Sequence, residues 1–464
     1  MAKVAHLIGA DELHKFDVPG PRYTSYPTAD RFVEVFGADD YALALAQRSS
    51  RPAALVLPLS LYVHIPFCES LCYYCACDTI ITKRHERAAP YLQYLSKEVD
   101  LHTAVLGLGR AVSQLHLGGG SPTYLSDDEL RGLMAMLRLN FAFAANAECS
   151  IEIDPRTVSV ARLDALANLG FSRLSFGVQD FDPVVQAAVH RVQPAEEIFA
   201  LVEAARARGF SSINVDLMYG LPQQTSESFD RTLAQVNALR PNRIALYGYA
   251  HLPAQFKSQR HIAADTLPSA HDKTHMLSRA LDALLDAGYV YVGVDHFALP
   301  DDPVAVAKRQ GRLHRNFQGY STQPDGDVLG FGVSAIGRIG ATYSQNTKDM
   351  QAYCASLDQG HFPVVRGFAL SRDDLLRRGV IMALMCQGDV QFESIELAYL
   401  VDFKTYFSKE LDALAELRDQ GMLTIDDAGI TVTEQGRFIA RAIAVVFDRY
   451  LQSDRTRACT SKII

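Results

Sequence analysis

The sequence predicts an α/β fold in which an incomplete (β/α)6 barrel, similar to a TIM barrel, carries an irregular N-terminal arm and a mostly helical C-terminal domain. Short apolar runs alternate with amphipathic helical segments, which is typical of a parallel sheet built from βαβ units. Six such units are recognisable, too few for a closed eight-stranded barrel. We expect three parts: a covering arm over residues 1–50, the barrel over 51–360 and the C-terminal domain over 361–464.

The strands are expected where β-rich apolar runs occur. These lie at residues 61–66, 113–119, 149–154, 173–178, 213–220 and 243–250, and a further run at 289–298 is a seventh strand or a cap. Helical patterns separate them. Ser126 and Glu129 have the spacing of a capping box, and Thr225 precedes another helix whose positive end carries Glu227.

The two ends of the chain differ from the barrel. Residues 16–32 contain prolines, a glycine and paired tyrosines, which favour an irregular extended segment over a helix. After about residue 360 helical patterns dominate, and residues 403–443 read as helix, short hairpin and helix, similar to a winged helix. Because its local charge is mixed, we expect this element to pack over the barrel as a lid and not to bind DNA.

The composition excludes several classes of protein. The formal net charge of −8 argues against a generic nucleic-acid binder. There is no apolar run of transmembrane length, and the N-terminus lacks the pattern of a secretion signal, so we expect a cytoplasmic protein. Eight cysteines do not form a disulfide framework in a chain of this size, because half of them are scattered, at Cys149, Cys354, Cys386 and Cys459.

The other four cysteines lie within ten residues, directly after the first expected strand. Cys68, Cys72 and Cys75 read C-x3-C-x2-C, with Tyr74 before the third. Three close thiolates can hold three irons of a 4Fe–4S cluster and leave the fourth iron open to a small ligand. Zinc sites usually use two C-x2-C pairs, and a ferredoxin-type carrier needs a fourth, distant cysteine, for which Cys77 is too close.

Further candidate residues lie where strands end. The glycine-rich segment 118–122 follows the second strand, where it makes a tight turn or lets free backbone N–H and C=O groups approach a ligand. Ligand sites in α/β barrels gather at the carboxyl ends of strands. Glu152 lies between two isoleucines, so its carboxylate needs a partner, which an arginine or a bound ligand could supply. Gln179, Arg191 and Asp216 are polar residues at or just beyond the ends of the next strands.

The cysteine motif, with its aromatic residue before the last cysteine, resembles the signature of the radical S-adenosylmethionine (SAM) superfamily. Over nearly its whole length the chain is similar to the oxygen-independent coproporphyrinogen III oxidase family of that superfamily. The stretches that carry the resemblance are PGPRYTSYPTA (19–29), LYVHIPFC with the cysteine motif (61–77), VSQLHLGGGSPTYL (112–125), SIEIDPR (150–156), FGVQDF (176–181), NVDLMYGLPQQT (214–225), YAHLP (249–253), DHFALPDD (295–302), LHRNFQGY (313–320) and GVSAIG (332–337).

The resemblance implies a radical SAM barrel in which Cys68, Cys72 and Cys75 hold one 4Fe–4S cluster and SAM binds the open iron. It implies SAM contacts at Tyr62, Tyr74, Gly119, Gly120, Ser121, Glu152, Gln179, Arg191, Asp216, Ala250 and Ile336. It also implies a second SAM molecule beside the first, near Gln318 and Ile336.

Four residues are candidates for the reaction itself: His64, Cys77, Arg22 and Gln318. Tyr62 and His64 share one face of the first strand; a strand histidine is ordinarily a satisfied core residue, but the resemblance links both to activity. Cys77 either fills buried space or acts in the reaction, since the oxidases resemble this chain there and related heme-carrying proteins typically have an aromatic residue. Arg22 suits a substrate carboxylate if the arm covers the barrel mouth, and is otherwise part of a solvated tail.

The resemblance implies conversion of coproporphyrinogen III to protoporphyrinogen IX in anaerobic heme and porphyrin synthesis. A 5′-deoxyadenosyl radical made from SAM would remove a β-hydrogen from each of two propionates, which become vinyls. The expected partners are coproporphyrinogen III and an electron donor such as a flavodoxin or ferredoxin, with no nucleic acid, no membrane and a monomeric state. Two rivals remain open: a heme-binding chaperone on the same scaffold, and a nucleic-acid regulator that uses the C-terminal domain.

Overall fold

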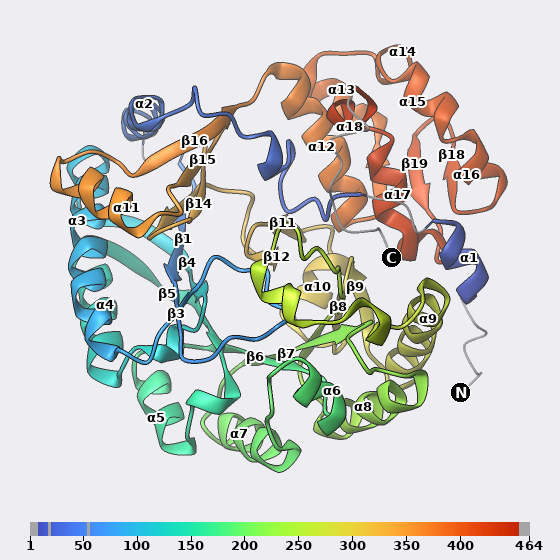
Figure 1. Ribbon diagram of the computed structural model, residues 1–464. Coiled ribbons are helices and arrows are strands. Elements are labelled where there is room, and N and C mark those ends of the chain that lie inside the picture. Colours follow the sequence, from blue (N-terminus) through green and yellow to red (C-terminus); the bar gives the residue numbers. More distant parts are fainter. Residues whose placement is uncertain (1–7, 17–19, 53–55, 454–464) are drawn as a thin grey trace.

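A twelve-stranded sheet forms the body of the protein in the computed structural model, which describes residues 8–16, 20–52 and 56–453. Six neighbouring strands at its centre are all parallel, which confirms the incomplete barrel (Figure 1). Both faces of the first of them are largely buried, one by apolar residues and the other, with Ser60, Tyr62 and His64, toward the barrel interior. The six are β1 (Leu59–Ile65), β4 (Arg110–Gly119), β5 (Phe141–Ile153), β6 (Arg173–Gln179), β7 (Ser212–Tyr219) and β8 (Arg243–Gly248).

Helices return the chain from each strand to the next and form the outer ring in Figure 1. Both expected helix starts are confirmed: the backbone N–H of Glu129 donates to Ser126 Oγ at 3.3 Å, and that of Ser228 donates to Thr225 Oγ1 at 3.1 Å. These caps satisfy donors that the first helical turn leaves free. The helices are α3 (Ala88–Leu106), α4 (Asp127–Asn140), α5 (Val160–Asn168), α6 (Pro183–Ala188), α7 (Ala195–Ala207), α8 (Ser226–Leu239) and α9 (Ala270–Asp286).

The expected run at 289–298 is a cap on one edge of the sheet. It forms the antiparallel hairpin β9 (Val290–Gly293) and β10 (His296–Ala298), and β10 pairs with β8. On the opposite edge β13 (Val328–Phe331) pairs in parallel with β1, and three antiparallel strands follow it. The sequence did not predict this extension, whose last strand lies beyond the expected end of the barrel at residue 360. The three antiparallel strands are β14 (Ile336–Ile339), β15 (Thr342–Asn346) and β16 (Val364–Ala369).

Two small pairs of strands and two short helices lie near the barrel mouth or beside the sheet. The pairs are β2 (Phe67–Cys68) with β3 (Ile80–Ile81), and β11 (His314–Asn316) with β12 (Gly319–Ser321). The helices are α10 (Pro303–Arg309) and α11 (Met350–Asp358).

The C-terminal region is mostly helical and contains the expected helix–hairpin–helix order. The helical part before the hairpin is divided into three short helices, and a third strand joins the hairpin. The region contacts the barrel edge, since the rings of Phe438 and Tyr291 lie 4.9 Å apart between centroids. Its elements are α12 (Arg372–Cys386), β17 (Asp389–Gln391), α13 (Phe392–Tyr399), α14 (Phe403–Tyr406), α15 (Ser408–Ala413), α16 (Ala415–Asp419), β18 (Leu423–Ile425), β19 (Gly429–Val432), α17 (Ala440–Val445) and α18 (Arg449–Ser453).

The N-terminal segment contacts both the barrel and the C-terminal region. Helix α1 (Ala10–Lys15) packs on α9, and α2 (Ala38–Ser49) packs on α3 and the added strands. Residues 20–28, between them, form no helix or strand, and Tyr23 and Tyr26 are fully buried. The hydroxyl of Tyr23 donates to Asp448 of the C-terminal region at 3.0 Å. Over the described residues, no helix combines the length and apolar character that a membrane crossing requires. Cys459 lies outside the described residues.

Candidate active site

A cavity of about 280 Å³ opens at the carboxyl ends of the parallel strands, beside the cysteine loop. It brings together most of the residues expected from sequence. Those that line it are Cys68, Cys72, Tyr74, Cys75, Cys77, Gly119, Gly120, Ser121, Glu152, Gln179, Arg191 and Asp216.

The cysteine loop is held in place by contacts from distant segments. The hydroxyl of Ser258 donates to the carbonyl of Cys75 at 2.5 Å, and Gln259 Nε2 donates to the carbonyl of Tyr74 at 3.1 Å. Burial raises the pKa of the Cys68 thiol to about 12, whereas hydrogen bonding from Cys77 lowers that of Cys75 to about 7. The thiols therefore face one cavity on a loop whose backbone is fixed.

The donor set fits a 4Fe–4S cluster better than a single ion. Within the described ranges, no three His, Cys, Asp or Glu side chains are placed to share one metal ion. The thiols of Cys68, Cys72 and Cys75 instead line a common cavity. Each would bind a different iron of a cluster, which requires wider spacing than ligands of one ion have.

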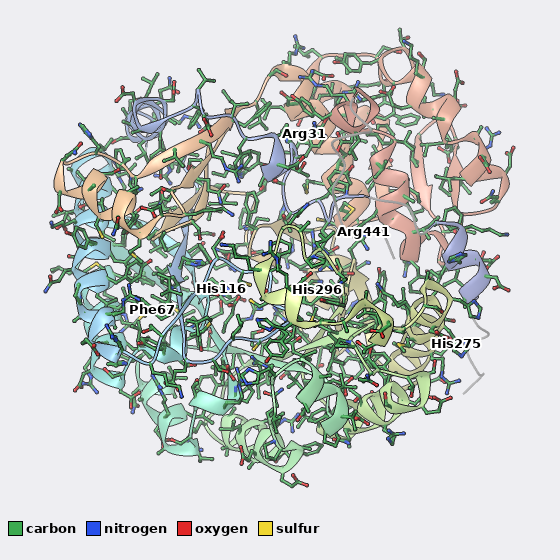
Figure 2. The ribbon with its side chains drawn as sticks, viewed as in Figure 1. Arg31, Phe67, His116, His275, His296 and Arg441 are labelled. Carbon is green, nitrogen blue, oxygen red and sulfur yellow. The ribbon has the colours of Figure 1, made fainter. Side chains whose placement is uncertain are left out.

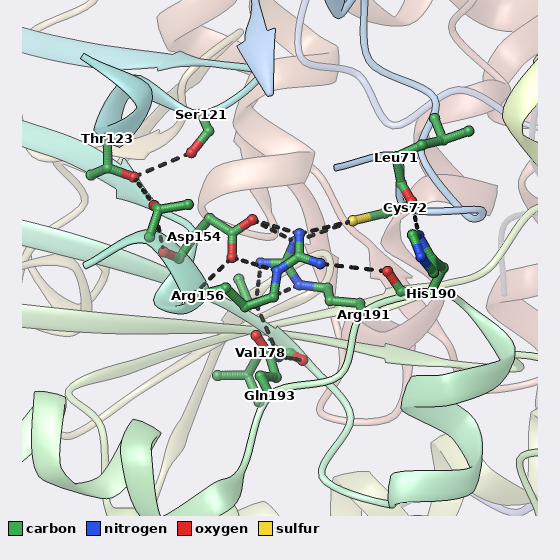
Figure 3. Close-up of polar contacts among 12 residues, drawn as sticks. Leu71, Cys72, Ser121, Thr123, Asp154, Arg156, Val178, His190, Arg191 and Gln193 are labelled. Atoms are coloured by element: carbon green, nitrogen blue, oxygen red, sulfur yellow. Dashed lines mark hydrogen bonds and ion pairs between the residues drawn. The ribbon is translucent and has the colours of Figure 1, made fainter. Parts of the chain in front are cut away.

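Two arginines reach the cysteine loop from the barrel (Figure 3). Nη1 of Arg191 lies 3.4 Å from Cys72 Sγ, and Nη2 of Arg156 lies 3.5 Å from the same sulfur. Both guanidinium groups also pair with Asp154, at 3.4 and 2.7 Å. Burial would raise the pKa of Asp154, but the charge of Arg191 and the hydrogen bonds from Arg156 hold it below its usual range. This arrangement puts net positive charge beside a thiol that would carry negative charge as an iron ligand.

The glycine-rich turn differs from expectation in one respect, because its backbone N–H groups are already bonded. Gly119 N–H donates to Glu152 Oε2 at 3.1 Å, and Gly120 and Ser121 N–H donate to the carbonyls of Ile65 and Phe67 at 2.8 and 2.9 Å. Gly119 has a φ of +118°, and a Cβ there would lie 2.7 Å from the His64 ring. Close packing against the His64 ring of β1 therefore requires glycine here, and the expectation of free N–H groups was wrong.

Besides Asp154, which pairs with the two arginines, Glu152 and Asp216 bring carboxylates to the cavity. Glu152 was expected to need a partner for its carboxylate. The structure supplies the N–H of Gly119 and His116 Nε2, at 3.3 Å from Oε1, and not an arginine. Asp216 accepts from Asn214 Nδ2 at 2.8 Å and from Ser175 Oγ at 3.2 Å. Burial and the charge of Glu152 raise the pKa of Asp216 to about 7. Glu152 and Asp216 thus offer carboxylate acceptors to the cavity.

Three expected SAM contacts do not line this cavity: Tyr62, Ala250 and Ile336. Tyr62 stacks on His116 with centroids 5.9 Å apart. The carbonyl of Ala250 accepts from Gln259, the residue that also holds the cysteine loop. Ile336 lies on β14, with its backbone against Gly330. Their roles toward SAM stay predictions.

Gln318 lines a second cavity, of about 130 Å³, inside the barrel. Its Nε2 donates to the carbonyl of Leu61 at 3.3 Å, and its Oε1 has no hydrogen-bond partner within the described part of the chain. Glu152, Asp216 and Tyr247 line both cavities, so the two adjoin.

Of the other reaction candidates, Cys77 lines the first cavity, whereas His64 and Arg22 line neither of the two. His64 is buried between the Tyr62 hydroxyl, 3.1 Å from Nδ1, and the Asp78 carbonyl, 3.1 Å from Nε2. Burial lowers its pKa, so the ring is neutral. Cys77 is exposed at the cavity, and its N–H donates to Cys75 Sγ at 3.4 Å.

Arg22 reaches the carboxyl end of β8. Its Nη2 donates to the Gly248 carbonyl at 3.3 Å, Nη1 lies 3.4 Å from Asp295 Oδ2, and its guanidinium carbon lies 4.9 Å from the centre of the Tyr247 ring. The arm therefore extends to the barrel mouth.

The polar or aromatic lining residues from the barrel strands and their ends that sequence reasoning missed include Asp154, Arg156, Ser175 and Tyr247. Asp154 and Arg156 lie two and four residues after Glu152, just beyond the end of β5. A search for polar residues at strand ends, which selected Glu152, could therefore have found them. Ser175 and Tyr247 lie on strands, and the two-residue alternation of inward-facing positions was the available signal.

Comparison with known proteins agrees with this geometry. The radical SAM superfamily model matches residues 62–236, and a HemN C-terminal domain model matches residues 370–439. Oxygen-independent coproporphyrinogen III oxidase of Pseudomonas aeruginosa is 49% identical over 446 residues, 96% of each chain. The protein of that name from Escherichia coli K12 is 48% identical and that from Synechocystis 42%, over 97% and 98% of each chain.

A solved structure of coproporphyrinogen III oxidase (HemN) from E. coli, described as a radical SAM enzyme, has a TM-score of 0.89 and 48% sequence identity, covering 93% of this chain and 98% of that chain. These relatives lend no support to a heme chaperone or a nucleic-acid regulator. Family membership implies a 4Fe–4S cluster and SAM as cofactors and makes the chain an oxidoreductase. The chain therefore belongs to the radical SAM superfamily and, within it, to the oxygen-independent coproporphyrinogen III oxidases.

Proposed function

We propose that this chain converts coproporphyrinogen III to protoporphyrinogen IX at the cavity described above. In this reaction each of two propionates loses CO2, one β-hydrogen atom and one electron, and becomes a vinyl group. The observation that carries the proposal is the shared cavity of three thiols and the strand-end polar residues, in a chain 48% identical to a HemN structure over nearly its full length.

The cofactor residues have separate tasks. Cys68, Cys72 and Cys75 would hold the 4Fe–4S cluster. When bound, the cluster and SAM supply a 5′-deoxyadenosyl radical that removes a hydrogen atom from an unactivated carbon. Glu152 and Asp216 offer acceptors to the ammonium and hydroxyl groups of SAM.

The remaining predicted SAM residues complete the binding site in this proposal. Tyr74, Gln179 and Arg191 form its wall beside the cysteine loop, and Gly119, Gly120 and Ser121 form the turn below it. Gln318 and Ile336 would contact a second SAM molecule. The unpaired Oε1 of Gln318 supports this role, because it faces a cavity that adjoins the first.

The substrate residues act by position. Arg22 stands at the barrel mouth, where its guanidinium suits a propionate carboxylate. His64 is neutral and tied to Tyr62, so it orients groups and does not add charge. Cys77 is exposed beside Cys75, where its thiol can reach a bound reactant.

The cellular setting extends the proposal. The cluster needs one-electron reduction, for which a flavodoxin or ferredoxin is suited. We expect a monomeric enzyme in the cytoplasm that binds neither nucleic acid nor membrane.

An anaerobic incubation tests the function. Reconstituted protein receives SAM, a one-electron reductant and coproporphyrinogen III, and the porphyrin products are separated by chromatography. Protoporphyrinogen IX together with 5′-deoxyadenosine is the expected result. Unchanged substrate in the presence of a complete cluster would overturn the proposal.

A further inference from the structure

Three arginines from separate parts of the chain lie close enough to Asp295 for their charges to lower the pKa of its carboxyl. Arg22 comes from the arm, Arg315 from β11 and Arg441 from α17 of the C-terminal region. Asp295 lies in the turn between β9 and β10, with a φ of +66°, and its side chain is 11% exposed. Figure 2 labels Arg441 and His296, which follows Asp295 in the chain.

Arg315 is a buried cation that forms no ion pair with an acidic side chain among the described residues. It is 4% exposed, and its Nε and Nη1 find no hydrogen-bond acceptor within the described residues. Its guanidinium carbon lies 4.6 Å from the centre of the Tyr320 ring, which lines the barrel cavity. An aromatic face offsets only part of the cost of burying a charge, so this position is unfavourable for stability without a further partner.

Arg441 is also a buried cation that lacks a hydrogen-bond acceptor among the described residues. It is 6% exposed, and its Nη1 has no acceptor among residues the structure describes. Burial and the charge of Arg22 lower its pKa, although the charge of Asp295 opposes them. Asp295 contacts Arg22 at 3.4 Å and so cannot neutralise all three arginines.

The charges at this point do not balance. Burial would raise the pKa of Asp295, but Arg22, Arg441 and Arg315 lower it, so the carboxylate is ionised. His296 is neutral, because burial and the charge of Arg315 lower its pKa to about 4. Three guanidinium groups therefore face one carboxylate, which leaves two positive charges without an acidic partner among the described groups.

These unbalanced positive charges lie next to the proposed reaction site. Arg22 packs over Tyr247, and Tyr247 lines both the cysteine cavity and the barrel cavity. The ring of His296 lies 6.0 Å from that of Tyr247 and 5.2 Å from that of Tyr320, between centroids. Arg22 and Arg315 thus approach the barrel cavity through two rings that line it, those of Tyr247 and Tyr320. Arg441 and Asp295 line a smaller cavity of about 30 Å³, which shares Phe297 with the barrel cavity.

We propose that Arg22, Arg315 and Arg441 bind the two propionate carboxylates of the substrate that the reaction leaves unchanged, with Asp295 as their resident counter-ion. Two added carboxylates would balance the two surplus charges. Arginine is suited to this task through bidentate pairing. Holding the unreactive propionates on this side would present the other two toward the cysteine loop. This inference rests on the proposed function.

Binding of coproporphyrin III, the stable oxidised form of the substrate, tests the inference by its fluorescence. The full-length, cluster-loaded protein is compared with its Arg315→Gln and Arg441→Gln variants. We expect the dissociation constant to rise roughly tenfold or more in each variant, with SAM affinity unchanged. The tetramethyl ester of coproporphyrin III, which has no carboxylates, should bind all three proteins equally.

Two controls separate binding from folding. Arg437→Gln removes a more exposed arginine close to Arg441 in the chain and should leave affinity unchanged. Melting temperatures of Arg315→Gln and Arg441→Gln should equal or exceed that of the wild type, because an unpaired buried charge is removed. A variant that binds acid and ester equally weakly, with a lower melting temperature, would assign the arginine to packing and overturn the inference.

The outcomes distinguish the inference from the proposed function. Wild-type affinity for coproporphyrin III in both variants overturns the inference alone when the wild type makes protoporphyrinogen IX. Arginine-dependent binding by a wild-type protein that makes no vinyl product supports the inference and contradicts the proposed function.

Discussion

Arg191 and Cys72 are in direct contact, with Nη1 3.4 Å from Sγ, although the two residues are 119 positions apart in the chain. Arg191 also donates through Nε and Nη2 to the carbonyl of Gly177, at 3.1 and 2.6 Å. One buried guanidinium therefore joins the cysteine loop to the end of β6.

Replacing Arg191 with glutamine should weaken electron transfer to the cluster. Removing a positive charge beside a redox centre lowers its reduction potential, here by an amount on the order of tens of millivolts. SAM cleavage should fall roughly tenfold. Spectroscopic redox titration measures the potential, and Arg208→Gln, which alters a surface pair with Asp164, is the control. An unchanged potential would contradict the assigned role.

Replacing Cys68, Cys72 or Cys75 with serine should remove the iron–sulfur absorbance and the activity. Each thiol lines the same cavity, and the loss of one leaves an iron without its protein ligand. Iron and sulfide analysis after anaerobic reconstitution measures the effect, and circular dichroism checks the fold. A reconstituted variant that still cleaves SAM would show that the ligands are assigned wrongly.

Cys77→Ser should retain the cluster and lose turnover. Serine keeps the backbone N–H that donates to Cys75 Sγ, and its hydroxyl can replace the side-chain hydrogen bond from Cys77 to Cys75. We expect product formation to fall roughly tenfold with a normal cluster spectrum. Equal turnover in both proteins would assign Cys77 to packing.

Arg22→Ala should raise the KM for coproporphyrinogen III and leave SAM binding intact. A hydrogen bond to a charged group contributes about 1.5–3 kcal/mol, which predicts a rise of roughly tenfold or more. Steady-state kinetics measures KM, and Arg51→Ala, an exposed position after α2, is the control. Normal kinetics would reject a substrate role for the arm.

Glu98 should make stability depend on pH. It is fully buried on α3, and Gly332 N–H, Asn346 Nδ2 and the Tyr353 hydroxyl donate to it at 2.7, 2.7 and 2.6 Å. Burial nevertheless raises its pKa from 4.5 to about 7. A raised carboxyl pKa favours the folded state below pH 4.5, and this contribution is lost as pH rises through about 7.

The Glu98→Gln variant should lack this part of the pH dependence. Relative to the variant, the wild type should lose on the order of 2 kcal/mol of unfolding free energy between pH 5 and 8. Urea unfolding at both pH values measures it. Tyr353→Phe removes a donor that lowers the pKa of Glu98. In that variant the pH-dependent loss of stability should therefore occur at higher pH than in the wild type. Parallel slopes in wild type and Glu98→Gln would disprove the prediction.

Local patterns predicted the centre of the fold well. The six parallel strands and the caps at Ser126 and Thr225 follow from hydrophobic runs and from side chains close in sequence. The strands β13 to β16 were missed, because they have only four to six residues each and lack a clear alternating pattern. Their place in the sheet depends on β1, which is more than 260 residues earlier.

The sequence by itself determined the chemistry that this protein can perform: the spacing of Cys68, Cys72 and Cys75 and the polar residues at strand ends are local features. Only the tertiary structure decided how those groups are charged and held. The contact of Arg191 with Cys72 and the three arginines around Asp295 join segments far apart in the chain. Such contacts depend on how the strands curve and on what covers the barrel, and no short sequence pattern records either.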